Sequence, residues 1–481
     1  MENSNSSSQS YQGDDKLLIG LVFAVITFGL FAQTIMNIAS TIRLDLGIGI
    51  NASNTAVSIS ALFSGIFVVL VGGFADRFGR LKMIRIGLAL NIVGSALIAL
   101  SPTGTAVFLL AGRILQGLSS ASIMPSALAV IKAYYQDSQR QRALSFYSIG
   151  SWGAVGLSSL FGGFIASTIG WQWIYVFSII ISILSFLLIR GVPESKNPST
   201  DKRDFDFPGM ITFMIGIIAI NVAISQGSSL GWLSPITLIL GLLSVISFIM
   251  FFRFNKRRED NFIDFTLFES QSYKGATLSN FLLNGSAGTL VISLSLVQIG
   301  AGLSTLQAGY LTIGYVIGIL IAIRVGEKLL AKWGPRRPMF LGCMVTALGI
   351  FMNSFTLIYA SQYMVVATIG FTFFGIGLGL YATPSADAAL AYIPQEKSGT
   401  ASGIYRMTAS LGNAFGMAIS AAIFAGLSIG SIRFVEGIFW GRTDNIAVRY
   451  AALVALLFNL FMAIIAGISV LLTIPKEKKD N

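Results

Sequence analysis

The segment Gly72-Gly-Phe-Ala-Asp-Arg-Phe-Gly-Arg-Leu-Lys82 separates two apolar runs, at 55–75 and 86–101, that we predict to be membrane-spanning helices. Glycine lets helices approach closely at a tight turn, and lysine and arginine favour the cytoplasmic side of a membrane. An ordinary basic loop would account for the positive charges but not for this order of glycine, acid and base. The segment therefore predicts a specialised turn on the inner membrane face.

The composition independently places the chain in a membrane. Of its 481 residues, 54% are hydrophobic and 11% are charged, and the apolar residues form long runs instead of the amphipathic spacing of a soluble domain. The net charge of +11 is spread over short loops, which indicates a topology signal and not a nucleic-acid surface. The single cysteine, Cys343, excludes a disulfide within the chain. Residues 1–16 lack the features of a signal peptide, so we expect a disordered tail there.

Charges and turn residues divide the remaining chain into fourteen predicted spans. With the N-terminus inside, 26 of the 32 lysine and arginine residues fall in inner loops and tails, and four fall in outer loops. This skew predicts that both termini are cytoplasmic, because removing one span would reverse every later loop. The predicted spans are 17–39, 55–75, 86–101, 106–131, 143–168, 172–189, 208–226, 234–252, 276–299, 305–323, 339–359, 363–391, 399–426 and 450–474.

The two halves of the chain resemble each other. Residues 117–131 in the fourth span are similar to 377–391 in the twelfth, and Gly334-Pro-Arg-Arg337 is a weaker echo of the basic turn. Chance similarity between helices rich in small residues is the alternative for the helix match alone. Two related bundles with an inserted pair of helices fit the span count. We therefore predict an all-α integral membrane fold of 6 + 2 + 6 helices, divided into a tail (1–16), a six-helix bundle (17–189), linkers with the inserted helices 208–226 and 234–252 (190–275), a second six-helix bundle (276–474) and a tail (475–481).

Several motifs resemble those of one transporter family. The order G-x-x-x-D-R-x-G-R-x-K in 72–82 resembles the loop between helices 2 and 3 of major facilitator proteins. Arg113-Ile-Leu-Gln-Gly117 resembles the R-x-x-q-G element of proton-driven facilitators. The glycines of 150–163 resemble an antiporter motif, although serines replace its Gly-Pro pair. Close helix packing is the alternative role for these glycines.

Other segments narrow this resemblance. Gly170-Trp-Gln-Trp-Ile174, Phe205-Asp-Phe-Pro-Gly209 and Ala401-Ser-Gly-Ile-Tyr405, together with the fourteen spans, resemble the fourteen-helix drug:proton antiporter family. The chain is most similar to the Nor-type quinolone and multidrug efflux pumps of Gram-positive bacteria. The segments that carry this likeness are 16–20, 140–145, 148–153, 280–285 and 381–385.

The resemblance implies proton-coupled efflux of amphipathic compounds such as quinolones by alternating access. It implies a monomer in the cell membrane of a Gram-positive bacterium, with no cofactor, no metal and no nucleic-acid partner. Protons, membrane lipids and small amphipathic drugs are the expected partners. It also implies a conformational gate at the basic turn, formed by Gly72, Asp76, Arg77, Gly79 and Arg80.

Proton coupling must use a carboxylate, because the chain has no histidine. Asp387 is the one acid well inside a predicted span, three residues after Pro384, and Glu327 at a span end is the next candidate. Arg406 lies at a similar depth in the following span and can pair with Asp387; a fixed structural ion pair is the alternative. Arg113 can bias the protonation of a nearby acid, or serve as a structural hydrogen-bond hub.

The expected drug cavity lies between spans 1, 4, 9 and 12, which correspond to the cavity-lining helices of facilitators. An apolar and aromatic surface with a few hydrogen-bonding groups suits amphipathic compounds. Ordinary packing is the alternative for each residue taken singly. The candidate lining residues are Phe28, Phe31, Gln33, Asn37, Met124, Asn280, Asn284, Gln298, Phe374 and Tyr381.

The first span departs from the broader family. Its members often carry D-x-T-x-x-N there, whereas this chain has Ala32-Gln-Thr-Ile-Met-Asn37 and no acid. Relatives that hold cationic drugs through that aspartate are therefore poor guides to its substrate. A proton-coupled transporter of a metabolite or lipid-like compound and a non-transporting membrane sensor remain as alternatives. An enzyme is disfavoured, because the sequence has no His/Cys cluster, phosphate-binding loop or Ser/His/Asp set.

Overall fold

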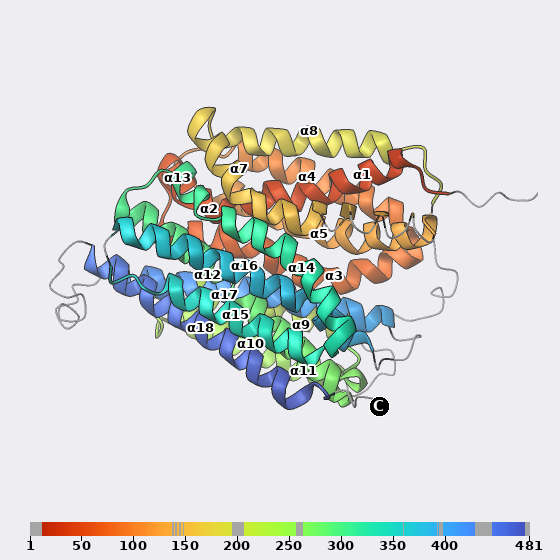
Figure 1. Ribbon diagram of the computed structural model, residues 1–481. Coiled ribbons are helices and arrows are strands. Elements are labelled where there is room, and N and C mark those ends of the chain that lie inside the picture. Colours follow the sequence, from red (N-terminus) through yellow and green to blue (C-terminus); the bar gives the residue numbers. More distant parts are fainter. Residues whose placement is uncertain are drawn as a thin grey trace, which may run out of the picture.

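The structure is a computed structural model of the chain (Figure 1). Most of the segment 427–448, which joins the last two predicted spans, and the end of the C-terminal tail lie outside the residues that it describes. These residues are 12–136, 139, 142–143, 146–147, 149–194, 206–255, 263–358, 360–391, 393, 398–428 and 445–476.

All regular elements in the described residues are helical, and thirteen segments are long and apolar enough to cross a membrane. A fourteenth helix, α15 (Arg336–Asn353), packs between α16 and α18. It is less apolar overall because two arginines begin it and an asparagine ends it. The prediction of fourteen spans is confirmed. The other segments are α1 (Asp15–Ile26), η1 (Thr27–Phe31), η2 (Ala32–Thr34) and α2 (Ile35–Leu46) in one span; α3 (Ile50–Phe78); α4 (Arg80–Ala99); α5 (Val107–Tyr134); η3 (Ile149–Gly153) with α7 (Ala154–Thr168); α8 (Gln172–Ile189); α9 (Phe207–Leu230); α10 (Pro235–Asn255); α11 (Gln271–Gly285), α12 (Gly288–Ser295) and η6 (Leu296–Gly300); α13 (Thr305–Tyr310) with α14 (Ile313–Trp333); α16 (Ala360–Leu390); α17 (Ser398–Ser428); and α18 (Ile446–Thr473).

Several helices continue beyond the predicted spans. The first span ends at Leu46 instead of 39, and α14 ends at Trp333 instead of 323. Charged residues such as Arg43 and Glu327 interrupt the apolar runs, and they mark the end of the hydrophobic part and not the end of the helix. Charge is a good guide to what lies in lipid and a poor guide to where hydrogen bonding stops.

The helices form two bundles that lie side by side in Figure 1. We call α1 to α8 the N-terminal bundle and α11 to α18 the C-terminal bundle. The first helix begins and the last helix ends on the right in Figure 1, which we call the terminal end; the opposite end, which holds α13, is the α13 end. The helices of the two bundles lie closer together at the α13 end than at the terminal end (Figure 1).

Two seams join the bundles. One is the packing of α3 on α17, and the other is the packing of α7 on α13 and α14. Glycines make the second seam close: a Cβ atom on Gly156 would lie 3.1 Å from a methyl of Val316, and one on Gly163 would lie 2.5 Å from the Thr305 carbonyl oxygen. These glycines of the antiporter-like segment therefore serve close packing between the bundles.

The inserted helices α9 and α10 lie on the outside of the first seam. Helix α9 packs on both α3 and α17, and Gln226 Nε2 donates to Thr55 Oγ1 of α3 at 2.9 Å. Helix α10 packs on α9, where Ser244 Oγ donates to the Gly216 carbonyl at 2.9 Å. The remaining surface of α10 is apolar and exposed, as in Leu238 and Leu242, which suits contact with lipid.

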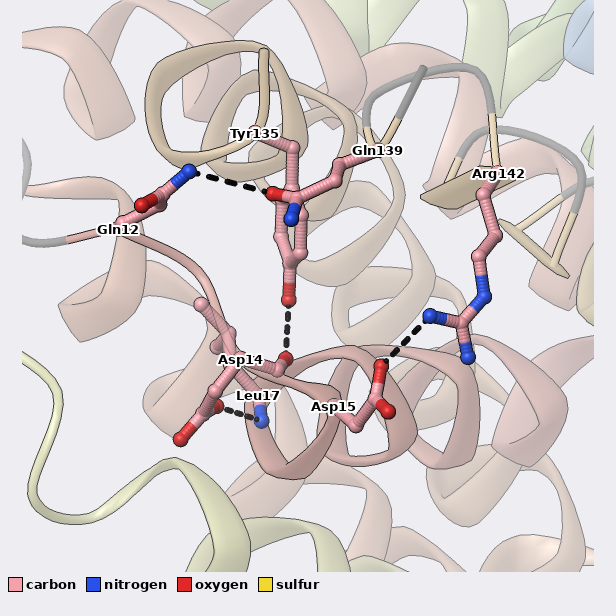
Figure 2. A network of polar contacts seen from close by, with 7 residues as sticks. All are labelled: Gln12, Asp14, Asp15, Leu17, Tyr135, Gln139 and Arg142. Atoms are coloured by element: carbon pink, nitrogen blue, oxygen red, sulfur yellow. Dashed lines mark hydrogen bonds and ion pairs between the residues drawn. The ribbon is translucent and has the colours of Figure 1, made fainter. Parts of the chain in front are cut away.

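Figure 2 shows how the chain before α1 is fastened to the base of α5. The Tyr135 hydroxyl donates to the Asp14 carbonyl at 2.6 Å, and Asp14 Oδ1 accepts the Leu17 amide at 2.7 Å as the cap of α1. Arg142 pairs with Asp15 at 3.0 Å. The expectation of a disordered tail up to residue 16 is therefore wrong for its last five residues. Gln12 Nε2 adds a hydrogen bond to Gln139 Oε1 at 3.3 Å.

Candidate functional site

Arg113 is fully buried in α5 and is the centre of a hydrogen-bond cluster. Its Nε donates to the Ala56 carbonyl of α3 at 2.9 Å, and its Nη1 donates to the Ala32 carbonyl of the first span at 2.7 Å. Nη1 also donates to Gln116 Oε1 at 2.7 Å, and Nη2 donates to Ser60 Oγ at 2.5 Å. One guanidinium thus ties three spans of the N-terminal bundle together.

The backbone of the first span is irregular where it meets this guanidinium. The chain forms a π-turn at Thr27–Phe31 and a 3₁₀ turn at Ala32–Thr34 before α geometry resumes. Such breaks redirect carbonyl groups away from the regular ladder, and they are tolerated at membrane depth where protein groups satisfy them. The bond from Arg113 to the Ala32 carbonyl fits this description.

A chain of neutral side chains extends the cluster. Gln116 Nε2 donates to Ser95 Oγ at 3.3 Å, and Asn91 Nδ2 donates to Ser178 Oγ and Ser182 Oγ at 2.9 and 2.8 Å. In the described part of the chain, all hydrogen-bond partners of Arg113 are neutral. This arrangement agrees with the second of the two roles considered from the sequence, a structural hydrogen-bond hub. A part for Arg113 in proton coupling stays a prediction.

Asp387 lies in α16 three residues after Pro384, which is inside the helix. Its side chain is exposed, whereas Arg406 on α17 is half-buried. The described residues show ion pairs at Asp15–Arg142 and Arg324–Glu327 but none between Asp387 and Arg406. The predicted pair is therefore not formed in this conformation, and a part for Asp387 in proton coupling stays a prediction.

Glu327 has a different environment. It lies on α14, and its Oε2 is 3.2 Å from Arg324 Nη1 one helical turn away. Both side chains are more than half exposed. Such an exposed pair contributes little stability, about 0–1 kcal/mol. Glu327 is therefore a surface acid with a local partner, and Asp387 remains the first candidate for the proton site.

Polar groups of the predicted cavity gather inside the C-terminal bundle. The Tyr381 hydroxyl lies 2.6 Å from Ser279 Oγ, and Asn280 Nδ2 donates to the Tyr405 carbonyl at 2.9 Å. Asn284 Nδ2 donates to both the carbonyl and the side-chain oxygen of Asn280, at 2.8 and 2.9 Å. These bonds link α11, α16 and α17 at the level where α16 contains its proline.

The aromatic candidates divide between core and partly exposed positions. Phe374 is fully buried with its ring centroid 5.9 Å from that of Tyr315, so it packs within the C-terminal bundle. Phe31 is nearly buried and meets Phe161 edge to face at 5.5 Å. Phe28 and Met124 are half-buried, and Gln33 is buried.

Two further cavity candidates lie elsewhere. Asn37 and Gln298 meet at the α13 end, where Gln298 Nε2 donates to the Asn37 carbonyl and to its Oδ1, each at 2.8 Å. The structure thus brings together polar residues from opposite bundles that the sequence assigned only to a common cavity.

Comparison with known proteins identifies the scaffold. The sequence profile of the Major Facilitator Superfamily matches residues 21–417. The chain belongs to the major facilitator superfamily. It is therefore a transporter and not an enzyme, and the described residues contain no group of three or more His, Cys, Asp or Glu side chains that could hold a metal.

Relatives and solved structures agree with this family. The chain is 45% identical over 471 residues to the quinolone resistance protein NorB of Staphylococcus aureus strain MRSA252, and 46% identical to that of the bovine strain RF122; each match covers 98% of both chains. The D-xylose-proton symporter has a TM-score of 0.62 at 17% identity and covers 96% of this chain and 97% of its own. A bacterial homologue of the lysosomal transporter Spinster, inward-facing and unoccupied, has a TM-score of 0.65 at 14% identity, with 97% and 99% covered. The resemblance to Nor-type facilitators is confirmed.

The basic turn of this facilitator lies between α3 and α4 at the terminal end. Gly79 has a φ of +121°, a region that side chains rarely adopt. Leu81 N and Lys82 N, in the first turn of α4, donate to the two carboxylate oxygens of Glu194 at 2.8 and 3.0 Å. The turn is thus capped by an acid from beyond α8. The side chains of the predicted gate residues Asp76 and Arg77 lie outside the described atoms.

Sequence reasoning missed Glu194, although it had a signal. The carboxylate follows Pro193, directly after α8, and Arg85 Nη2 donates to the Ile189 carbonyl at 3.3 Å beside it. The Tyr134 hydroxyl donates to the Pro193 carbonyl at 2.6 Å. An acid and a proline just past a span, near a basic turn in space, mark a helix cap, but the proximity follows only from the fold.

Proposed function

We propose that this facilitator exports amphipathic compounds, including quinolones, in exchange for protons by alternating access. The observation that carries the proposal is the 45% identity to a quinolone resistance protein over 98% of both chains. Proton coupling is typical of facilitators of this type. The chain acts as a monomer in the cell membrane of a Gram-positive bacterium, as its staphylococcal relatives suggest.

The arrangement of the bundles supports alternating access. They are bonded to each other at the α13 end and splay toward the terminal end (Figure 1). We place both termini in the cytoplasm, because most lysines and arginines fall in loops of the terminal end. In that orientation this conformation is closed to the outside.

Asp387 is the proposed proton carrier. It is exposed on α16, three residues after Pro384, on the helix that also bears the cavity candidate Tyr381. A carboxylate that water reaches in one conformation and that apolar surroundings cover in the other can load and release a proton. Arg406 and Arg113 are proposed to tune that exchange through their charge.

The decisive experiment uses purified protein in proteoliposomes with an imposed pH gradient and no other component. Uptake of a fluoroquinolone against its gradient, abolished by a protonophore, supports drug:proton exchange. Counterflow with metabolites but not with the drug would redirect the proposal to a metabolite transporter. No gradient-dependent flux of any compound would contradict transport of these substrates altogether.

Orientation is tested separately by thiol labelling. In a Cys343→Ala background, Thr103→Cys reports the exposed loop of the α13 end and Ala331→Cys reports exposed surface of the terminal end. An impermeant reagent on intact cells should label the first and spare the second. The reverse pattern would place the termini outside.

The gate is tested at Asp76. We propose that Asp76, Arg77 and Arg80, with Gly72 and Gly79, latch the terminal end in the conformation that is open to the outside. Asp76→Asn should slow turnover more than it weakens drug binding, because the lost contacts belong to one conformation and not to the binding site. Turnover equal to that of the parent protein would contradict a gating role.

A further inference from the structure

Three hydrogen-bonding side chains and two backbone carbonyls join the bundles at the α13 end. Asn37 Nδ2 donates to the Thr305 carbonyl at 2.9 Å, and Gln298 Nε2 donates to the Asn37 carbonyl and Oδ1 at 2.8 Å each. Ser40 Oγ donates to Gln298 Oε1. We propose that Asn37 and Gln298 form a latch that closes the α13 end and must open once in every transport cycle.

Both amide groups are fully used in this arrangement. Asn37 is 1% exposed, and its Nδ2 makes a second bond, to the Ser159 carbonyl of α7 at 2.7 Å. The oxygen and nitrogen of Gln298 are both bonded to the first span. Every hydrogen bond of the pair except the one to Ser159 crosses from one bundle to the other, so separation of the bundles breaks all of these together.

The backbone on either side is shaped for this contact. A Cβ atom on Gly309 would lie 3.0 Å from the Ser159 carbonyl oxygen, and one on Gly163 would lie 2.5 Å from the Thr305 carbonyl oxygen. Gln298 lies in the π-turn Leu296–Gly300, where the chain leaves α geometry. The two bundles therefore meet backbone to backbone around the amides, which leaves little room for water to replace their bonds.

Because these hydrogen bonds cross between the bundles, they differ from structural hydrogen bonds inside one bundle. Ties within a bundle, such as Asn91 to Ser178 and Ser182, persist in every conformation of a rigid-body motion. Bonds that exist only when one end is closed stabilise that conformation alone, and they set its population. The inference rests on membership of a transporter family and holds whatever compound is carried.

The test measures the opening directly and uses no substrate. Spin labels at Thr103→Cys and Ser361→Cys, exposed residues of the two bundles at the α13 end, report the separation of the bundles in lipid nanodiscs in a Cys343→Ala background. Asn37→Ala should raise the ratio of long-distance to short-distance populations by about tenfold, the effect of about 1.4 kcal/mol on a two-state equilibrium.

Gln298→Glu is the second variant, because it keeps the shape of the side chain and replaces the donating nitrogen by an oxygen that faces two acceptors on Asn37. It should open the α13 end at least as far, and Ser40→Ala should do so less. Asn91→Ala is the matched control, a buried asparagine with two bonds inside one bundle, and should leave the distances unchanged. Unaltered distributions in both Asn37→Ala and Gln298→Glu, or an equal shift in Asn91→Ala, would overturn the latch. Since no drug is present, failure of quinolone export would leave this result unaffected.

Discussion

The α13 end and the terminal end of this transporter use similar polar groups for opposite purposes. At the α13 end, Asn37 and Gln298 bond one bundle to the other. At the terminal end, Glu194 caps α4 and Tyr135 holds the chain before α1, both within the N-terminal bundle. Bonds inside a bundle keep it rigid, and bonds between bundles choose the conformation. Whether a hydrogen bond lies within one bundle or between two therefore indicates its role better than its strength does.

Bonds between the bundles can select a conformation only if each bundle is itself stable. Arg113→Ala is the substitution that should destabilise the N-terminal bundle most. The substitution leaves the buried carbonyls of Ala32 and Ala56 without their donor, at a cost of about 1–3 kcal/mol each. We expect a large fall in the melting temperature of the purified protein and little folded material. Arg85→Ala is the control, because its longer bonds to the end of α8 lie at a partly exposed site. Equal losses in the two variants would show that Arg113 is not a central hub.

The next effect tests closure at the α13 end. Gly163→Val places a branched side chain against the Thr305 carbonyl, where even a Cβ atom is at 2.5 Å. The bundles cannot then meet, so we expect the labels at Thr103 and Ser361 to separate and transport to fall by more than about tenfold. Gly241→Val is the control, since nothing lies within 4 Å of a Cβ atom there. Normal transport by Gly163→Val would show that closure tolerates a gap at this seam.

Substitution of Asp387, on the half of α16 that leads to the terminal end, should abolish proton-driven accumulation of drug and leave other steps intact. Asp387→Asn imitates only the protonated state, so accumulation of drug against its gradient should disappear while downhill exchange remains. Drug-induced proton release from the purified variant gives a direct measurement. Release equal to that of the parent would eliminate Asp387 and turn attention to Glu327. Arg406→Ala should leave folding intact, because the two residues form no ion pair in this conformation.

The fold could be predicted well from the sequence, because a helix that crosses a lipid bilayer needs a run of apolar residues of a fixed minimum length. Runs of apolar residues of the right length, with charges in the inner loops, were sufficient to place all fourteen helices. Helix ends were less accurate, since helices such as α14 continue past their last apolar residue. The family resemblance also followed from local motifs, which are contiguous in the chain.

The candidate site could be predicted only in part, because the roles of its residues depend on contacts between segments that are distant in the sequence. Arg113 was identified as a costly buried charge, but its neutral partners lie on three different spans, and one of them is the Ala32 carbonyl in the irregular part of the first span. Asn37 and Gln298 were assigned to one cavity by helix number, and only the structure shows them bonded to each other at 2.8 Å. Glu194 was missed, since 112 positions separate it from Lys82.

The smallest expected effect is a loss of stability in Gly79→Ala at the terminal end. It tests whether the hydrogen bonds of Glu194 stabilise the N-terminal bundle alone. Gly79→Ala introduces a Cβ atom 2.5 Å from the Glu194 carboxyl carbon on a backbone with φ of +121°. Gly104→Ala has a φ of +83° and nothing within 4 Å, so it measures the backbone cost alone, about 1–2 kcal/mol. The extra loss of stability in Gly79→Ala then belongs to the displaced cap of α4, about 1 kcal/mol or less because Glu194 is exposed. Glu194→Ala in the same protein should remove most of that extra loss, because it removes the side-chain atoms that the added Cβ atom would meet, and neither change should alter the distance between the labels at the α13 end. A shift of that distance would mean that the cap of α4 also controls the opening of the bundles.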